Sequence, residues 1–425
     1  MIFEPYRIKV VEPLPVSSRR MRQQALRSAG YNPFQLPARS VVIDLISDSG
    51  TSAMSVEQWV SLFRAREDFS GQDAHVAYVK TAERITGFPY IQPVHQGRAA
   101  ERILCSLLVK PGSVTLSNGH FETTRENIRA VGGRPYDLLG PEPPYIGNID
   151  LDSVARKIRS GIKVSMVIMT MTNNVYGGQP VSLSNLAQVR RLTRSRRIPL
   201  VIDASRWADN AYLIREYSHL RTSIPAISRS IFRHADIAYF SSKKDGLSNI
   251  GGCLAVRDRR LFDRITVEII RQESYPSSGG LAARDLAAMT EGMKEAVDLR
   301  FLKFHIASLR FLAAALKQRG VRVYEPVGGH GVVILPPRSV ANGPFALAAR
   351  IYLDSGIRTG VFSDSVRLAL PRRVYTHSQI GYIAEAIADA CHRPLPRLQP
   401  VNSPPSFRNF FIRFRETQPP ALGRG

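Results

Sequence analysis

The types and spacing of three residues could support chemistry at a carbon atom: the neighbouring lysines Lys243 and Lys244, and Asp203. Asp203 ends the apolar run PLVID, and the lysines follow 40 and 41 positions later in SSKKD, after the apolar run IAYFSS. A lysine amine can form an imine with an aldehyde and carry a proton, and a carboxylate can keep a ring nitrogen protonated. Together with a phosphate anchor, these are the groups that a pyridoxal-phosphate site requires.

A candidate phosphate anchor precedes them in the chain. The string HQGRAAERILCSLL (95–108) places a glycine turn directly before a helical pattern, and Arg98 adds a cation. Unpaired backbone N–H groups and the positive end of the helix dipole favour a phosphate at such a position. Asn174 follows another apolar run, VIMTMT, and precedes the turn GGQP. Two alternatives stay open on spacing alone: Asp203 could cap the next helix beside a solvated lysine pair, and a generic nucleotide-binding α/β fold fits equally well.

The elements that must position these residues alternate along the middle of the chain. Short apolar, β-branched runs lie at 113–118, 135–139, 164–172, 199–205, 237–242 and 252–258, and several are apolar at every position. Helical patterns separate them, such as 183–195, for which we expect Ser184 as the N-terminal cap. This rhythm predicts an α/β fold with a large, doubly wound, mostly parallel sheet. Ligands of such sheets bind at the carboxyl ends of the strands, where the candidate residues lie.

The pattern changes from about residue 280, where a long helical region leads into shorter runs at 321–326, 329–336 and 365–371 and a helix near 377–391. This predicts a second, smaller α+β domain. We expect four parts: an N-terminal arm that packs with the small domain (1–47), a large cofactor-binding domain (48–295), a small domain (296–415) and a flexible tail (416–425).

Composition indicates a globular protein of the cytoplasm. Apolar residues make up 44% and charged residues 22%, and no apolar run approaches the about 20 residues of a membrane helix. The three cysteines are far apart and odd in number, which argues against disulfides and zinc sites. The net charge of +23 could attract nucleic acid, but the arginines are scattered and no nucleic-acid-binding motif accompanies them. We therefore expect a solvated basic surface, with neither a membrane nor a nucleic acid as partner.

Several long strings give the chain a family resemblance. They include EPYRIKVVEP, YNPFQLPARSVVIDLISDSGTSAMS, HQGRAAE, NNVYGGQPVSLSNL, IDASRWADNAYLI, SSKKDGLSNIGG, EPVGGHGVV and RLALPRRVYTH. In these strings and their order, the chain resembles the tryptophanase and tyrosine phenol-lyase family of β-eliminating lyases over nearly its whole length. The resemblance implies the aspartate-aminotransferase-like fold (fold type I of pyridoxal-phosphate enzymes), amino-acid metabolism and assembly as a homotetramer or dimer.

The resemblance also implies roles for individual residues. Lys244 would be the Schiff-base lysine, Asp203 would pair with the pyridine nitrogen, and Arg367, helped by Ser49, would bind the substrate carboxylate. Contacts to the ring and phosphate of the cofactor would come from Gln96, Gly97, Arg98, Phe121, Asn174, Arg206, Ser241 and Ser278. Ser278 stands where the family has a tyrosine that reaches the phosphate of the neighbouring subunit. Gly50, Glu67 and Asn249 would form a monovalent-cation site, with K⁺ as the candidate ion.

Departures from the family pattern fall on the side of the leaving group. Phe69, in REDFSGQ, stands where the family has a catalytic tyrosine, and phenylalanine cannot donate a proton to a departing carbon. The other substrate-side positions that differ or could compensate are Glu122, Tyr275, Phe362 and Asn409. We expect β-elimination to pyruvate and ammonia with a thiol or another activated leaving group, because a thiolate departs with little help. The alternatives are β-replacement, transamination or decarboxylation on the same cofactor, and a non-catalytic binding protein.

Overall fold

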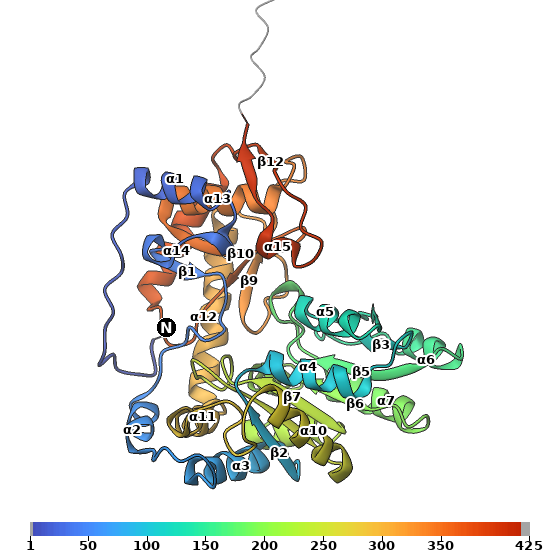
Figure 1. Cartoon of the computed structure of the whole chain (residues 1–425). Helices are drawn as coiled ribbons and strands as arrows, with labels where there is room; N and C mark the ends of the chain where they lie inside the picture. Colours follow the sequence, from blue (N-terminus) through green and yellow to red (C-terminus); the bar gives the residue numbers. More distant parts are fainter. Residues whose placement is uncertain (1–2, 418–425) are drawn as a thin grey trace, which may run out of the picture. The chain divides into compact units, whose positions relative to one another are not determined.

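A computed structural model describes residues 3–417, with the side chain of Val175 excepted. The chain forms two compact units (Figure 1). The sheet unit is Ser49–Lys303; the split unit combines Met1–Asp48 with Phe304–Gly425. The predicted boundaries at 47/48 and 295/296 remain predictions. None of the helices within residues 3–417 is long and apolar enough to cross a membrane.

The sheet unit is built on seven strands in the order β2-β8-β7-β6-β5-β3-β4. Five neighbouring strands run parallel, and β8 runs antiparallel to both of its neighbours. All six strands predicted for this region are present. The bounds are β2 (Tyr90–Val94), β3 (Val114–Ser117), β4 (Arg134–Asp137), β5 (Val164–Thr170), β6 (Leu200–Asp203), β7 (Ile237–Ser241) and β8 (Gly252–Val256).

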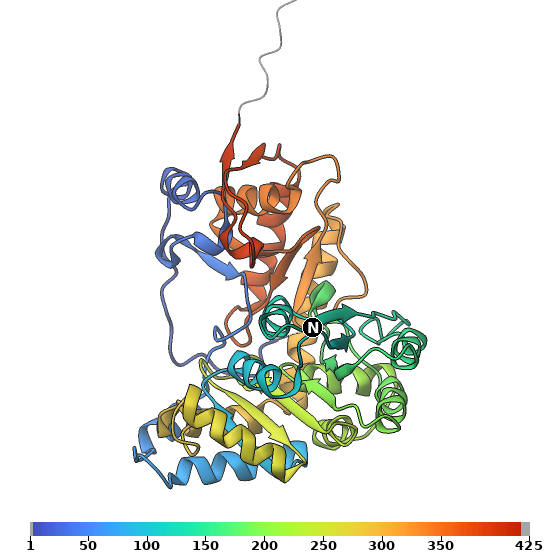
Figure 2. The same ribbon diagram turned by 45° about the vertical axis from the view of Figure 1, so that its right-hand side comes forward.

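Edge strand β2 was not predicted, because Pro93 interrupts its apolar run. Proline has no N–H to donate and is tolerated in an edge strand, where one side of the backbone is unpaired. Helices α4 (Gly97–Leu108) and α10 (Arg259–Gln272), cyan and olive in Figure 2, lie against this part of the sheet. Both helices contribute buried side chains to the hydrophobic core that they share with its strands.

Helix α7 (Leu183–Arg194) matches its predicted range, but its cap was predicted wrongly. The Ser182 hydroxyl, rather than that of Ser184, accepts the hydrogen bond from the backbone N–H of Asn185. A cap accepts from the N–H three residues ahead, and two serines only two positions apart leave that choice open in the sequence. The other helices of this unit are α2 (Val56–Arg64), α3 (Asp73–Thr86), α5 (Glu122–Ala130), α6 (Leu151–Arg159), α8 (Trp207–Tyr217), α9 (Ile224–Phe232) and α11 (Ala283–Glu295).

The split unit contains a four-stranded sheet in the order β1-β10-β11-β9. Its elements are β1 (Ile43–Leu45), β9 (Gly331–Ile334), β10 (Ile357–Val361), β11 (Val366–Ala369), α1 (Arg19–Ser28), α13 (Gly343–Ser355) and α14 (His377–Cys391). A two-stranded ribbon of β12 (Leu398–Pro400) and β13 (Phe414–Glu416) and the short α15 (Arg408–Phe411) follow. Helix α12 (Leu299–Gln318) begins in the sheet unit and continues here.

One predicted strand of the split unit, 321–326, is wrong. The segment makes a single isolated bridge, between Val323 and Ile334, because Pro326 supplies no N–H to extend the pairing. Strand β10 was not predicted, since Arg358 and Gly360 break its apolar pattern. The described N-terminal residues pack on this same unit: the Glu4 carboxylate accepts from the backbone N–H of His377. The predicted tail, apart from Glu416 and Thr417, lies outside the described residues.

Candidate active site

Asp203 ends β6 within the sheet unit, and Lys244 follows the end of β7, the next strand of the sheet. The Asp203 side chain is buried and accepts hydrogen bonds from the backbone N–H of Ser205 (3.1 Å) and from its hydroxyl (2.8 Å). Burial raises the pKa of Asp203, and the positive charge of Lys244 opposes this shift. The carboxylate and the amine therefore act on each other electrostatically in a site shielded from water.

Lys244 is anchored through its neighbour Asp245. The buried Asp245 carboxylate accepts from the backbone N–H groups of Ala208 (2.6 Å) and Asp209 (3.1 Å), and so caps the N-terminus of α8. Helix α8 begins four residues after Asp203. One carboxylate thus fixes the loop that carries the lysine to the helix that follows the aspartate, a role that the sequence did not indicate.

The start of α4 and the end of β7 meet at the predicted phosphate anchor. A Cβ atom on Gly97 would lie 2.9 Å from the backbone nitrogen of Ser241, so only glycine allows this approach. Gln96 pairs with Gly251 in an isolated bridge, which brings three chain segments together. Arg98, the second residue of α4, is exposed. The backbone N–H groups at the helix start, the dipole and the guanidinium all favour an anion here.

Asn174 and Arg206 are brought together at the next pair of strand ends. The Arg206 guanidinium donates to the Asn174 side-chain oxygen over 3.3 Å, and the backbone N–H of Arg206 donates to the Met171 carbonyl oxygen. Arg206 is buried. Two of the residues predicted to contact the cofactor therefore form one polar pair.

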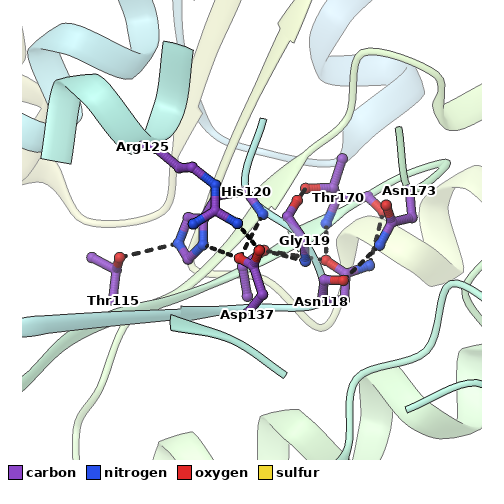
Figure 3. Close-up of polar contacts among 9 residues, drawn as sticks. Thr115, Asn118, Gly119, His120, Arg125, Asp137, Thr170 and Asn173 are labelled. Atoms are coloured by element: carbon purple, nitrogen blue, oxygen red, sulfur yellow. Dashed lines mark hydrogen bonds and ion pairs between the residues drawn. The ribbon is translucent and has the colours of Figure 1, made fainter. Parts of the chain in front are cut away.

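Side chains of two asparagines hold the segment before Phe121 in place by hydrogen bonds to the backbone (Figure 3). The Asn118 side chain donates to the carbonyl oxygens of Gly147 (2.7 Å) and Thr170 (3.2 Å) and accepts from the Thr170 N–H (2.8 Å). The Asn173 side chain donates in turn to the Asn118 carbonyl oxygen over 2.7 Å. These bonds tie the chain after β3 to the chain after β5, one residue before Asn174.

His120, the residue before Phe121, is fixed by a second set of contacts (Figure 3). Its ring nitrogens lie 2.6 Å from an Asp137 carboxylate oxygen and 3.1 Å from the Thr115 hydroxyl, and Arg125 pairs with Asp137. Burial lowers the pKa of His120 to about 3, so the ring is neutral. Asn118, Asn173 and His120 were not predicted from the sequence, although they lie at or just after the ends of predicted strands, where polar site residues gather.

Phe69 and Tyr275 form an aromatic pair, with ring centroids 5.3 Å apart. Their exposures are 79% and 45%, respectively. The Ser278 hydroxyl donates to the Tyr275 carbonyl oxygen over 3.0 Å. Glu122 is the first residue of α5, and burial raises the pKa of its carboxyl group.

The three residues predicted for a cation divide into two groups. The Asn249 side chain donates to the carbonyl oxygen of Gly50 over 3.0 Å. The Glu67 carboxylate instead accepts from the backbone N–H groups of Ala283 (2.7 Å) and Arg284 (3.2 Å) at the start of α11. Across residues 3–417, no hydrogen bond joins Glu67 to Gly50 or Asn249, and no cluster of three or more histidine, cysteine or acidic side chains could hold a metal ion. The potassium site remains a prediction.

Three predicted substrate residues belong to the split unit. Arg367, on β11, is buried with one guanidinium nitrogen 3.3 Å from the Nε2 atom of His330, and its guanidinium lies 4.8 Å from the centroid of the Phe362 ring. Asn409, on α15, offers its carbonyl oxygen to the Asn32 side chain over 3.0 Å. Ser49, the remaining substrate residue, is the first residue of the sheet unit.

Comparisons with known proteins agree with the predicted family. The β-eliminating lyase family model matches residues 44–386. The chain belongs to the β-eliminating lyase family. A tryptophanase of Salinibacter ruber is 40% identical, with 99% of this chain and 97% of the relative covered. A tyrosine phenol-lyase of Clostridium tetani is 36% identical, over 90% of this chain and 91% of that protein.

Solved structures confirm the predicted fold class of this family member. A threonine aldolase of Leishmania major has a TM-score of 0.60 at 16% identity and covers 82% of this chain and 99% of its own. A serine palmitoyltransferase of Sphingomonas wittichii has a TM-score of 0.61 at 11% identity, with 82% and 87% covered. These neighbours are fold type I enzymes, and the α/β architecture of the sheet unit is the same.

Proposed function

We propose that this family member is a pyridoxal-phosphate-dependent lyase that removes the Cα proton of an amino acid and eliminates its β-substituent, with pyruvate and ammonia as products. The observation that carries the proposal is the buried Asp203 carboxylate in the field of the Lys244 amine, beside a helix start suited to phosphate. Among residues 3–417 the Asp203 carboxylate has no ion-pair partner within 4 Å, so it suits a protonated ring nitrogen. The residues present therefore fit the cofactor.

Each side chain of the proposed site has a separate role. The cofactor supplies an electron sink for the negative charge that develops at Cα. Lys244 takes the proton from Cα, and Asp203 keeps the ring nitrogen protonated. Asn174 and Arg206 would hold the oxygen side of the cofactor ring, and the backbone N–H groups at the start of α4 and the Arg98 side chain would hold its phosphate. A guanidinium binds a carboxylate through two parallel hydrogen bonds, and the family resemblance gives this role toward the substrate to Arg367.

The cofactor assignment is tested with two adjacent lysines. Wild-type protein loaded with pyridoxal phosphate is reduced with borohydride, digested and mapped by mass spectrometry. We expect the adduct on Lys244, so Lys244→Ala should abolish it. Lys243→Ala is the matched control, because it removes an identical side chain at the next position and should keep the adduct. An adduct that moves to Lys243, or none at all, would contradict the proposal.

Phe69 carries the proposal for the leaving group. A phenylalanine supplies no proton to a departing carbon, whereas a thiolate needs none. We propose that S-substituted cysteines or similarly activated amino acids are the substrates. A missing general acid costs at least about a hundredfold in rate. Pyruvate release from S-alkyl and S-aryl cysteines should therefore exceed release from tryptophan and tyrosine by at least about a hundredfold.

The variant Phe69→Tyr restores a hydroxyl and should raise indole or phenol release while leaving thioether turnover within about twofold. Phe63→Tyr is the control, since Phe63 is equally exposed at 80% and lies on α2. Robust release of indole or phenol by the wild-type protein would refute the thiol assignment. If no amino acid yields pyruvate but a new amino acid forms when nucleophiles are added, β-replacement takes its place.

A further inference from the structure

A second carboxyl group, Glu101, lies buried on α4 and has no role in the proposed function. Its side chain accepts hydrogen bonds from the Thr123 and Thr124 hydroxyls, each at 3.0 Å, and from the Asn127 amide at 3.4 Å. The residue is 7% exposed. Among residues 3–417, no lysine, arginine or histidine lies within 4 Å to form an ion pair with it. Charged carboxylates are rarely buried without a cation, because the loss of hydration destabilises the charge.

Glu101 lies on the same side of the sheet as Asp203. Helix α4 covers the face of the sheet that carries Tyr239, and Tyr239 lies directly opposite Asp203 in the β6–β7 ladder. The Tyr239 hydroxyl is buried and has no hydrogen-bond partner among the described residues. The charged and titratable groups within electrostatic reach of Glu101 are Asp203 on β6, Tyr239 on β7, Cys105 on α4 and Lys244.

Two buried carboxyl groups near each other do not both ionise easily. Burial, and secondarily the charge of Asp203, raise the pKa of Glu101 to about 7. The hydroxyls of Thr123 and Thr124 and the charge of Lys244 oppose this shift without cancelling it. At neutral pH the two carboxyl groups together therefore hold a proton for part of the time.

We propose that Glu101 is a positioning residue for the cofactor ring nitrogen: it stores a proton near Asp203 and releases it to solvent when the cationic ring binds at Asp203. This inference rests on the proposed function. The positive ring nitrogen neutralises Asp203, which removes the repulsion on Glu101 and allows it to ionise. No other bond changes: the proton leaves the Glu101 carboxyl group for water, and the resulting carboxylate remains bonded to the two threonine hydroxyls. The second negative charge then helps to keep the ring nitrogen protonated.

Calorimetry of cofactor binding measures this proton directly. Full-length apo protein is titrated with pyridoxal phosphate at pH 7 in two buffers of different ionisation enthalpy, and the difference in heat gives the number of protons exchanged. With a pKa of about 7, Glu101 holds about half a proton before binding. Glu101→Gln removes this source, so the variant should take up about half a proton more per chain than the wild type. Glu268→Gln, on α10, is the control and should match the wild type.

A third variant separates charge from packing. Thr124→Val removes a hydrogen bond that favours the ionised form, so more protons should be stored and released, a shift opposite to that of Glu101→Gln. It also provides the test if Glu101→Gln fails to fold. Equal proton numbers in wild type and variants, with cofactor bound in each, would overturn the inference and leave the proposed function intact. Absence of cofactor binding by the wild type would instead refute the proposed function.

Discussion

Replacing Asp245 by alanine should destabilise the protein far more than the loss of an ordinary helix cap. The change removes the acceptor for the backbone N–H groups of Ala208 and Asp209, at 2.6 and 3.1 Å. Both residues are fully buried, so water cannot take the place of the carboxylate. A lost cap costs about 1 kcal/mol, and each buried donor left without a partner adds about 1–3 kcal/mol. With two such donors, we expect a loss of about 3–7 kcal/mol for Asp245→Ala.

The exposed cap Asp258 supplies a matched control, because it accepts from the Leu261 N–H over 2.6 Å at the start of α10. Asp258→Ala should cost about 1 kcal/mol, since water can hydrate the freed donors. Scanning calorimetry of the apo proteins compares the two variants, at about 2–4 °C of melting shift per kcal/mol for a unit of this size. Asp245→Asn keeps one acceptor oxygen and should lie between them. Equal shifts for Asp245→Ala and Asp258→Ala would refute the reasoning.

Three further predictions concern other parts of the structure. Gly251→Ala should destabilise the apo protein by about 2–4 kcal/mol in urea unfolding, because φ is +99° and a Cβ would lie 2.2 Å from a buried methionine sulfur. Gly87→Ala is the control and should cost less, because Gly87 also has a positive φ (+71°) but faces open space; equal costs would contradict the steric argument. Arg372→Met removes the guanidinium that lies 3.0 Å from the fully buried Asp48 carboxylate, and it should cost about 3–5 kcal/mol in thermal unfolding. The added change Asp48→Asn should restore most of this loss, because it removes the buried charge. Because burial raises the pKa of Glu101 to about 7, its contribution to apo stability is complete below the unfolded value near 4.5 and is lost as pH rises through about 7; Glu101→Gln should flatten this part of the stability–pH curve, and an unchanged slope would count against it.

The sequence predicted the elements whose pattern is uniform and missed those in which one residue disturbs it. The central strands are apolar at nearly every position, and their ends identified Asp203 and Lys244. Strand β2 was hidden by Pro93, which an edge position tolerates.

Glu101 could not be recognised for a different reason. In the sequence it is one charged residue in a helical pattern, and its burial depends on Thr123 and Thr124, which belong to the next helix. Contacts between elements decide such cases, and a single chain segment does not contain them. The same holds for Asn173, whose partner Asn118 is 55 positions away.

The antiparallel direction of β8 constrains the loop that carries Lys244. Strands β7 and β8 are antiparallel neighbours, so residues 242–251 leave and re-enter the sheet at the same end of the strands, without a crossover helix. Bonds from the Ser242 N–H to the Gly251 carbonyl oxygen (3.0 Å) and from the Ser248 N–H to the Ser242 carbonyl oxygen (3.1 Å) close the loop on itself. A short closed loop has few accessible conformations, so ordering it on ligand binding loses little chain entropy. Its closing amides should therefore exchange slowly with deuterium in the cofactor-free protein.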